Sequence, residues 1–146
     1  MKALIQKVSS GSVTVDGKTI GEIGKGIVAL LGITHGDTEK EVDFVLNKIV
    51  NCRIFPGERS DFDHSLQEVS GELLIVSQFT LYGSLKKGRR PDFGDAAPPE
   101  MAEKLYKLFV QKAQAIEGIK VATGQFQAHM QVALINDGPV TLMIES

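Results

Sequence analysis

A buried apolar run ends in residues that can bind the oxygen atoms of a substrate. The run covers residues 73–76, and the residues that follow it are Ser77, Gln78, Phe79 and Thr80. Hydroxyl, amide and backbone N–H groups at such a strand end can donate hydrogen bonds to a developing oxyanion. Strand ends that reach the surface are common places for binding sites. A hydrated strand end fits the same pattern equally well.

A serine–histidine pair is the second chemical possibility. Ser77 and His129 lie far apart in the sequence, as the partners of a hydrolase dyad can. His35, His64 and His129 share no metal-ligand spacing with one another or with Cys52. The sequence has no nucleotide-binding P-loop and no G-x-S-x-G elbow. We therefore expect no metal ion and no cofactor.

A Gly-Pro pair interrupts the last apolar segment. Gly138 and Pro139 lie between residues 132–134 and 140–144, whose apolar side chains alternate with period two, as in strands. Proline has no N–H for a sheet ladder, so it belongs at a strand start, an edge or a turn. A backbone break there leaves carbonyl oxygens free to meet water or a substrate.

One short segment holds the clearest basic cluster. Its cations are Lys86, Lys87, Arg89 and Arg90. Gly88 and Pro91 favour a loop at this place. Such a loop can hold the phosphates of a nucleic acid backbone, and a solvated loop fits the composition as well. The net charge of the chain is −2, so a nucleic-acid contact would have to come from this local patch.

Strands at both ends of the chain and two helices between them must position these residues. Thr38 and Glu41 form a capping box that predicts a helix over residues 38–51. Entry prolines and an exit glycine predict a second helix over residues 98–117. Strands are predicted over residues 2–8, 12–15, 18–20, 26–33, 73–76, 119–122 and 126–135, and after Pro139. This order favours a mixed α+β or layered α/β fold, with the helices covering one side of the β-sheets.

The length and composition of the chain, with 42% hydrophobic and 23% charged residues, fit one globular domain that spans residues 1–146. No apolar run approaches the ~18–20 residues of a membrane span. The N-terminus turns polar too soon for a signal peptide. A lone cysteine, Cys52, excludes an internal disulfide and suits a reducing compartment. We therefore expect a cytoplasmic protein with no membrane partner.

Two motifs together resemble those of the D-aminoacyl-tRNA deacylases. They are residues 77–81 (Ser-Gln-Phe-Thr-Leu) and residues 136–141 (Asn-Asp-Gly-Pro-Val-Thr). Supporting segments follow the family's order along the chain, at residues 53–55, 71–74, 87–93, 96–100 and 124–126, with Ala128 and Met130. Either motif alone is a weak signal, but both at this separation in a chain of this length are specific.

The resemblance implies a fold, a partner and a reaction. It implies a homodimer with active sites at the subunit interface, built from layered β-sheets with two main helices on one side. The implied reaction is hydrolysis of the ester that joins a D-amino acid to the terminal adenosine of a tRNA, a proofreading step. The family also removes glycine from glycyl-tRNA(Ala). In the family the Gly-Pro peptide is cis, and its carbonyls reach into the partner's active site.

The resemblance also assigns roles to individual residues. The pocket around the ester would be lined by Ser77, Gln78, Phe79 and Thr80. The filter that rejects L-amino acids would consist of Gly138 and Pro139. The adenosine would be contacted by Ala102, Phe126 and Met130. Candidate contacts to tRNA phosphates are Lys86, Lys87, Arg89 and Arg90.

Two positions depart from the family's usual residues. The family usually has arginine in place of Lys7, where it supports the Gly-Pro loop, and lysine lacks the planar fork of arginine. Gln127 occupies a position that is often glycine. A larger side chain there either alters the pocket wall or points outward.

The motifs contain no general base, so we expect the substrate to assist its own hydrolysis. The ribose hydroxyl next to the ester is already held close to the carbonyl, and such placement is worth effective molarities of roughly 10⁵–10⁸ M. Backbone N–H groups near Phe79 and Thr80 would bind the oxyanion. Two alternatives remain open: a tRNA- or RNA-binding module without catalysis, and a small-molecule esterase that uses Ser77 and His129.

Overall fold

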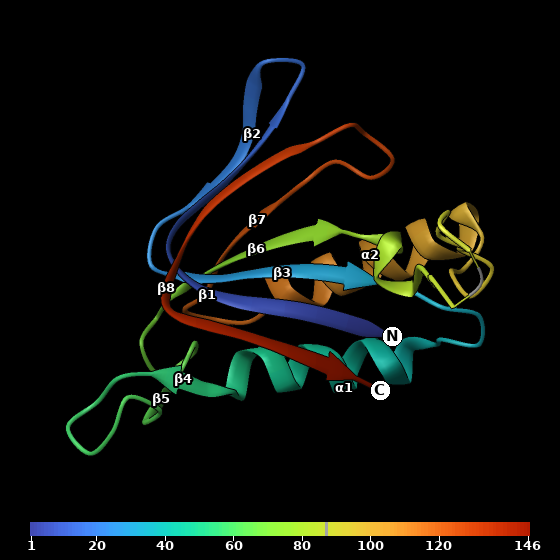
Figure 1. Ribbon diagram of the computed structural model, residues 1–146. Helices are drawn as coiled ribbons and strands as arrows, with labels where there is room; N and C mark the ends of the chain where they lie inside the picture. Colours follow the sequence, from blue (N-terminus) through green and yellow to red (C-terminus); the bar gives the residue numbers. More distant parts are fainter. Residues whose placement is uncertain (87) are drawn as a thin grey trace.

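The computed structural model describes residues 1–86 and 88–146, with long strands at both ends and two α-helices between them (Figure 1). The strands are β1 (Lys2–Val15), β2 (Lys18–Ile23), β3 (Gly26–Gly32), β4 (Arg53–Phe55), β5 (His64–Ser65), β6 (Glu72–Ser77), β7 (Lys120–Thr123) and β8 (Gln131–Glu145). The helices are α1 (Glu39–Asn51), α2 (Pro99–Gln114) and the short 3-10 helix η1 (Phe79–Tyr82).

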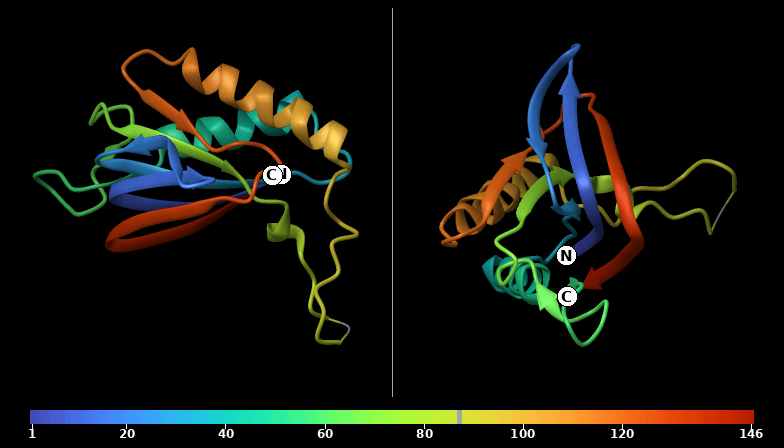
Figure 2. Two further views of the ribbon diagram at one scale, coloured as in Figure 1. Left: turned by 90° about the horizontal axis from the view of Figure 1, so that it is seen from above. Right: turned by 90° about the vertical axis from the view of Figure 1, so that its left-hand side faces the viewer.

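The main sheet is organised around β1. Its strand order is β2-β1-β3-β6-β7, and β8 pairs antiparallel with β1 from Lys2 opposite Glu145 to Thr14 opposite Gln131. β6 runs parallel to both β3 and β7. β2 folds back toward β7 and curls the sheet into a nearly closed barrel, while both α-helices lie on one side of it (Figure 2). The predicted mixed α+β fold with two helices on one side is therefore confirmed.

Local sequence signals explain several of these elements. The Thr38 side chain accepts a hydrogen bond from the Lys40 N–H, and the Glu41 carboxylate accepts one from the Thr38 N–H at 2.7 Å, so the predicted capping box begins α1. Asp16 and Gly17 both have positive φ, 49° and 75°, as the predicted tight hairpin between β1 and β2 requires.

The central strands are buried on both faces, as their continuous apolar sequence predicts. One set of alternating residues, which includes Ala29 and Ile75, packs against the helices. The other set, which includes Val28 and Leu74, fills the inside of the curled sheet. Ser77, the last residue of β6, is therefore held by a strand that is buried on both faces.

Several predicted boundaries were wrong. The strand predicted over residues 126–135 begins only at Gln131, because residues 124–130 form a loop in which Gln127 has a φ of 61°. β8 does not start after Pro139 but continues through it, since Gly138 and Pro139 lie in a bulge that needs no ladder N–H. The short pair β4 and β5 was not predicted.

The structure contains no helix, within residues 1–86 and 88–146, that is long and apolar enough to cross a membrane.

We predict that Gly26→Ala destabilises the protein by about 3 kcal/mol or more, at the upper end of overpacking effects. A Cβ at Gly26 would lie 1.9 Å from the Glu72 carbonyl oxygen, where β3 meets β6. Thermal or urea unfolding measures the loss. Gly24→Ala is the matched control, because a Cβ at Gly24 meets nothing within 4 Å. Equal stability of the two variants would contradict this account of the β3–β6 contact.

Candidate active site

The residues after β6 form a turn whose first backbone donors are free. The Gln78 N–H donates to the Leu31 carbonyl at 2.8 Å, which extends the sheet by one residue before η1 begins. The Gln78 side-chain amide donates to the Thr80 hydroxyl. For the N–H groups of Phe79 and Thr80, no acceptor is found in the described residues, because the first turn of a helix offers none. Two N–H groups therefore remain available next to a hydroxyl.

Aromatic side chains flank this turn. The Phe79 ring is 56% exposed and packs edge-to-face on Phe93, with ring centroids 5.0 Å apart. Gly83 makes room for Phe93, because a Cβ there would lie 2.8 Å from the Phe93 ring. Burial raises the pKa of the Tyr82 hydroxyl well above its usual range, so Tyr82 stays neutral. The turn thus has an exposed apolar rim that could contact a base or a side chain.

α2 and the 124–130 loop meet beside the end of β6. The Phe126 ring lies 5.8 Å from that of Tyr106, and Ala102 lies one turn earlier on the buried face of α2. The Tyr106 hydroxyl donates to the Ile75 carbonyl at 3.0 Å, and burial raises the pKa of Tyr106 to about 12. Tyr106 therefore remains a hydrogen-bond donor at neutral pH, and it fixes α2 to β6 two residues before Ser77.

Met130 closes the same loop. Its sulfur accepts a hydrogen bond from the Gln125 N–H at 3.4 Å and lies 2.7 Å from where a Cβ on Gly124 would be. Gln127 is exposed. Phe126 and Met130 thus belong to one short loop but pack against different core clusters.

Gly138 and Pro139 lie in an exposed bulge of β8, and the peptide bond between them is cis. The sheet register places the bulge opposite Lys7, and Lys7 pairs in turn with Ile27 of β3. Ser77 lies two strands beyond β1 in the sheet and four residues further along it. Counted from the bulge in β8, Ser77 is thus three strand spacings away across the sheet, about 14 Å, and four residues away along it, about 13 Å. One chain therefore does not bring the Gly-Pro pair to its own Ser77.

Lys7 follows Ala3 and Ile5 on the helix-facing side of β1, and it is only 8% exposed. Its Cε lies 3.7 Å from where a Cβ on Gly138 would be. No carboxylate pairs with Lys7 within the described parts of the chain. The residue is thus placed under the bulge, where it can act on the backbone of the Gly-Pro pair.

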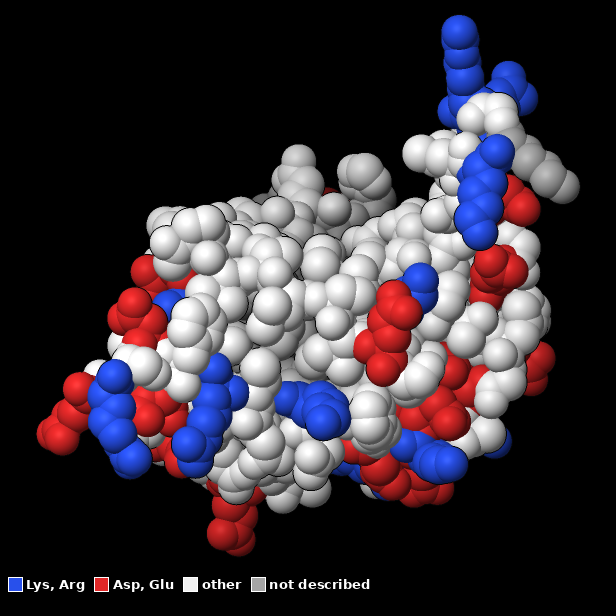
Figure 3. Space-filling view, turned by 60° about the horizontal axis from the view of Figure 1, so that its bottom comes forward, with Lys and Arg blue, Asp and Glu red and all other residues white. Residues whose placement is uncertain are grey.

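The basic cluster lies on a protruding loop. Ser84 and Asp92 exchange two backbone hydrogen bonds at its base, of 2.8 and 2.9 Å. Lys86, Arg89 and Arg90 are exposed beyond this bridge. A group of lysine and arginine side chains projects from the molecule at the upper right of Figure 3. The prediction for Lys87 lies outside the described residues.

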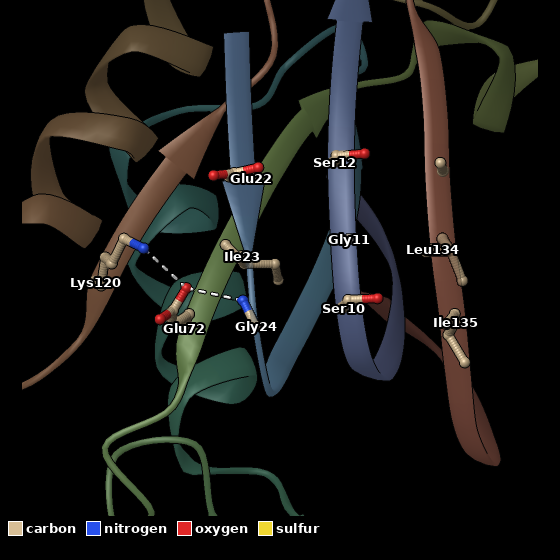
Figure 4. A pocket seen from close by; sticks show the side chains of 11 residues that line it. Ser10, Gly11, Ser12, Glu22, Ile23, Gly24, Glu72, Lys120, Leu134 and Ile135 are labelled. Atoms are coloured by element: carbon tan, nitrogen blue, oxygen red, sulfur yellow. Dashed lines mark hydrogen bonds and ion pairs between the residues drawn. The ribbon is translucent and has the colours of Figure 1, made fainter. Parts of the chain in front are cut away.

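An open groove of about 590 Å³ lies elsewhere and contains none of the predicted site residues (Figure 4). Two of its charged groups, Glu72 and Lys120, form an ion pair with each other. The Glu72 carboxylate accepts hydrogen bonds from the Gly24 N–H at 3.0 Å and from Lys120 at 3.2 Å, and these contacts lower the pKa of Glu72. Glu22 also lines the groove, and its exposed carboxylate has no ion-pair partner among the described residues.

The alternative chemistries have no assembled site. No hydrogen bond connects Ser77 with His129 within the described residues, and His129 is exposed in the 124–130 loop. In the same parts of the chain, no three His, Cys, Asp or Glu side chains gather as metal ligands. Sequence reasoning assigned no individual role to Asn136, although an asparagine two residues before Gly-Pro is a common turn signal.

Known proteins resemble the chain over its whole length. A family model described as D-Tyr-tRNA(Tyr) deacylase matches residues 4–145. A D-aminoacyl-tRNA deacylase from Clostridioides difficile is 55% identical over 100% of this chain and 97% of its own length. One from Desulfatibacillum aliphaticivorans is 53% identical over 100% and 99%. A solved structure titled c-Myc DNA Unwinding Element Binding Protein matches with a TM-score of 0.91 and 45% identity, covering 100% of this chain and 99% of that one.

The fold, the strand-end site and these full-length matches define a hydrolase of the deacylase class. The chain belongs to the D-Tyr-tRNA(Tyr) deacylase family.

We predict that Gln127→Gly stabilises the protein by roughly 0.5–1 kcal/mol, because glycine adopts the positive φ of 61° at this position without steric cost. Gln127→Ala is the control, since alanine shortens the side chain but keeps the strain. Chemical denaturation of the three proteins measures the difference. Equal gains from alanine and glycine would show that the side chain, and not the backbone, is responsible.

Proposed function

We propose that the chain is a proofreading hydrolase that cleaves the ester of D-aminoacyl-tRNA into free tRNA and a D-amino acid. The observation that carries this proposal is the pair of free N–H groups at Phe79 and Thr80, beside the Thr80 hydroxyl, in a chain that matches deacylases from end to end. Aminoacyl-tRNA is used for protein synthesis in the cytoplasm, so we place the enzyme in the cytoplasm. It needs no cofactor or metal ion in this mechanism.

The proposed reaction uses the substrate's own hydroxyl. Water attacks the ester carbonyl, and the negative charge that develops on its oxygen is stabilised by the N–H groups of Phe79 and Thr80. The ribose hydroxyl next to the ester activates the water or the carbonyl, because it is held at high effective concentration. Proton transfer to the departing ribose oxygen then releases the tRNA. Ser77, Gln78 and Phe79 line the pocket, while Ala102, Phe126 and Met130 hold the adenosine.

The proposed selectivity comes from exclusion. The carbonyls of Gly138 and Pro139 would occupy the space that an L side chain needs, whereas a D side chain points away from them. Glycine has no side chain to exclude, so glycyl-tRNA(Ala) is a second substrate. Lys7, buried beside Gly138, would support the pair in place of the arginine that is usual in the family.

This filter requires a second copy of the chain, because the register separates the Gly-Pro bulge from Ser77 within one chain. β8 supports a homodimer with active sites at the subunit interface. It pairs with β1 along one edge, and exposed apolar side chains lie along it, with Ile135 at 61%, Leu142 at 42% and Met143 at 46% exposure. Exposed apolar side chains on one long strand are typical of an association surface.

The protruding loop supports a role in holding the tRNA. Lys86, Arg89 and Arg90 are exposed, and no ion pair involves them within residues 1–86 and 88–146. Their charges are therefore free for phosphates, and Phe79 and Phe93 sit at the base of the loop. An RNA-binding module without catalysis would use the same loop, so catalysis has to be tested directly.

The first test compares the release of tyrosine from D-Tyr-tRNA and L-Tyr-tRNA. We expect hydrolysis of the D substrate only, and near-complete loss when the terminal ribose hydroxyl is replaced by hydrogen. Thr80→Ala and Ser77→Ala keep the backbone N–H groups, so we expect substantial activity from both, whereas loss of one oxyanion donor would cost about 2.7–4 kcal/mol.

Three results would contradict the proposal in different ways. An inactive Thr80→Ala variant that accompanies normal turnover of the deoxy substrate would make Thr80 a nucleophile. Inactivation by His129→Ala would favour the Ser77–His129 esterase. Binding of tRNA without release of either amino acid would leave a non-catalytic module.

The second test removes two cations from the loop. We predict that the Arg89→Ala/Arg90→Ala variant binds tRNA more weakly and lowers the slope of log affinity against log salt by about 2. Filter binding over a salt series measures both quantities. Lys18→Ala/Arg59→Ala removes the same charge from exposed positions outside the loop and is the control. The same slope in both double variants would exclude a specific role for the loop.

A further inference from the structure

The bulge that contains Gly138 and Pro139 has a defined width. Gln6 of β1 pairs with Thr141, and Val8 pairs with Asn136, so only Lys7 lies opposite the four residues between them. Residues 137–140 therefore have no paired residue on β1 in the ladder. Something other than the sheet has to fix their shape.

The Asn136 side chain joins the two ends of this bulge. Its oxygen accepts a hydrogen bond from the Val140 N–H at 3.0 Å, and its amide nitrogen donates to the Thr141 hydroxyl at 2.8 Å. The Val140 N–H can only donate, so the oxygen of Asn136 must face Val140 and its nitrogen must face Thr141. One carboxamide thus replaces the missing ladder contacts.

A second amide holds the same hydroxyl from the neighbouring strand. The Gln6 side-chain nitrogen donates to the Thr141 hydroxyl oxygen at 3.3 Å. Thr141 therefore accepts from Asn136 and from Gln6, which ties the far end of the bulge to β1. The three side chains form a short polar network on the surface of the sheet.

Val140 also limits the space around Gly138. Gly138 has a φ of 138°, and a Cβ there would lie 2.9 Å from the Val140 Cγ2 atom and 3.1 Å from the Val140 nitrogen. A side chain at position 138 would therefore collide with Val140, so the bulge in this conformation has room only for glycine there. The hydrogen bond from Val140 to Asn136 holds the residue that directly follows the Gly-Pro pair.

We propose that Asn136 is a positioning residue for the Gly138–Pro139 pair and determines how strictly L-amino acids are rejected. Thr141 and Gln6 orient the Asn136 amide from the other side. This inference rests on the proposed exclusion of L side chains. A filter that works by exclusion depends on the placement of its atoms more than on their chemistry. A less rigid bulge should therefore leave more room for an L side chain.

The first experiment does not depend on activity. Amide hydrogen exchange followed by NMR reports whether the Val140 N–H is held. We expect Asn136→Ala to speed this exchange about 2- to 12-fold, the range of one net hydrogen bond. Asn136→Asp keeps the acceptor oxygen and should retain protection. Asn51→Ala is the control, because Asn51 makes a comparable side-chain hydrogen bond, to the Asn47 carbonyl, in α1. Unchanged Val140 exchange in Asn136→Ala would overturn the proposal.

The second experiment measures selectivity as the ratio of hydrolysis rates for L-Tyr-tRNA and D-Tyr-tRNA. We expect Asn136→Ala to raise this ratio at least fivefold, Asn136→Asp to restore most of the selectivity, and Asn51→Ala to match the wild type. A folded Asn136→Ala variant with the wild-type ratio would overturn the role of Asn136 and leave the deacylase activity intact. A wild-type protein that hydrolyses neither substrate would instead refute the proposed function.

If Asn136→Ala does not fold, Thr141→Val and Thr141→Ser provide the same comparison. Valine removes the hydroxyl that accepts from both amides, whereas serine keeps it. Loss of selectivity with valine and its retention with serine would support the network. Equal ratios for the two variants would refute it.

Discussion

β1 forms hydrogen-bonded ladders along both of its edges, and the register of these ladders sets the positions of the proposed filter and of the proposed ester pocket. β8 covers one edge along nearly its whole length, while β3 and then β2 share the other. A slip of one residue would exchange the two faces of the strand. It would turn Lys7 away from Gly138 and shift β3, against which β6 delivers Ser77. The register therefore fixes at once the filter, the ester pocket and the distance between them.

Parts of the fold were predictable because the signals that create them are local. The capping box of α1, the Asp16-Gly17 hairpin and the doubly buried strands β3 and β6 each follow from residue types at a fixed spacing. Residues 126–130 were mistaken for strand, because their alternating apolar residues imitate period two. In the structure Phe126 packs on one core and Met130 on another, and Gln127 reverses the backbone between them.

The candidate site, too, was predictable from the sequence only in part. A polar strand end after residues 73–76 could be seen from pattern, and the family motifs named the residues around it. The sequence does not contain the spatial relation between Ser77 and Gly138, because that depends on strand order and register across β3 and β1. Asn136 was also overlooked, since its role depends on which N–H and which hydroxyl the bulge brings within reach of its amide.

The Ile75 carbonyl accepts two hydrogen bonds, one from the Tyr106 hydroxyl at 3.0 Å and one from the Gly124 N–H at 2.9 Å. Both lone pairs of a single oxygen are thus used to anchor α2 and the 124–130 loop to the same point of β6. In the proposed adenosine site between helix and loop, a nucleoside would meet walls that are already in place. Its binding would then lose little free energy to ordering of the protein.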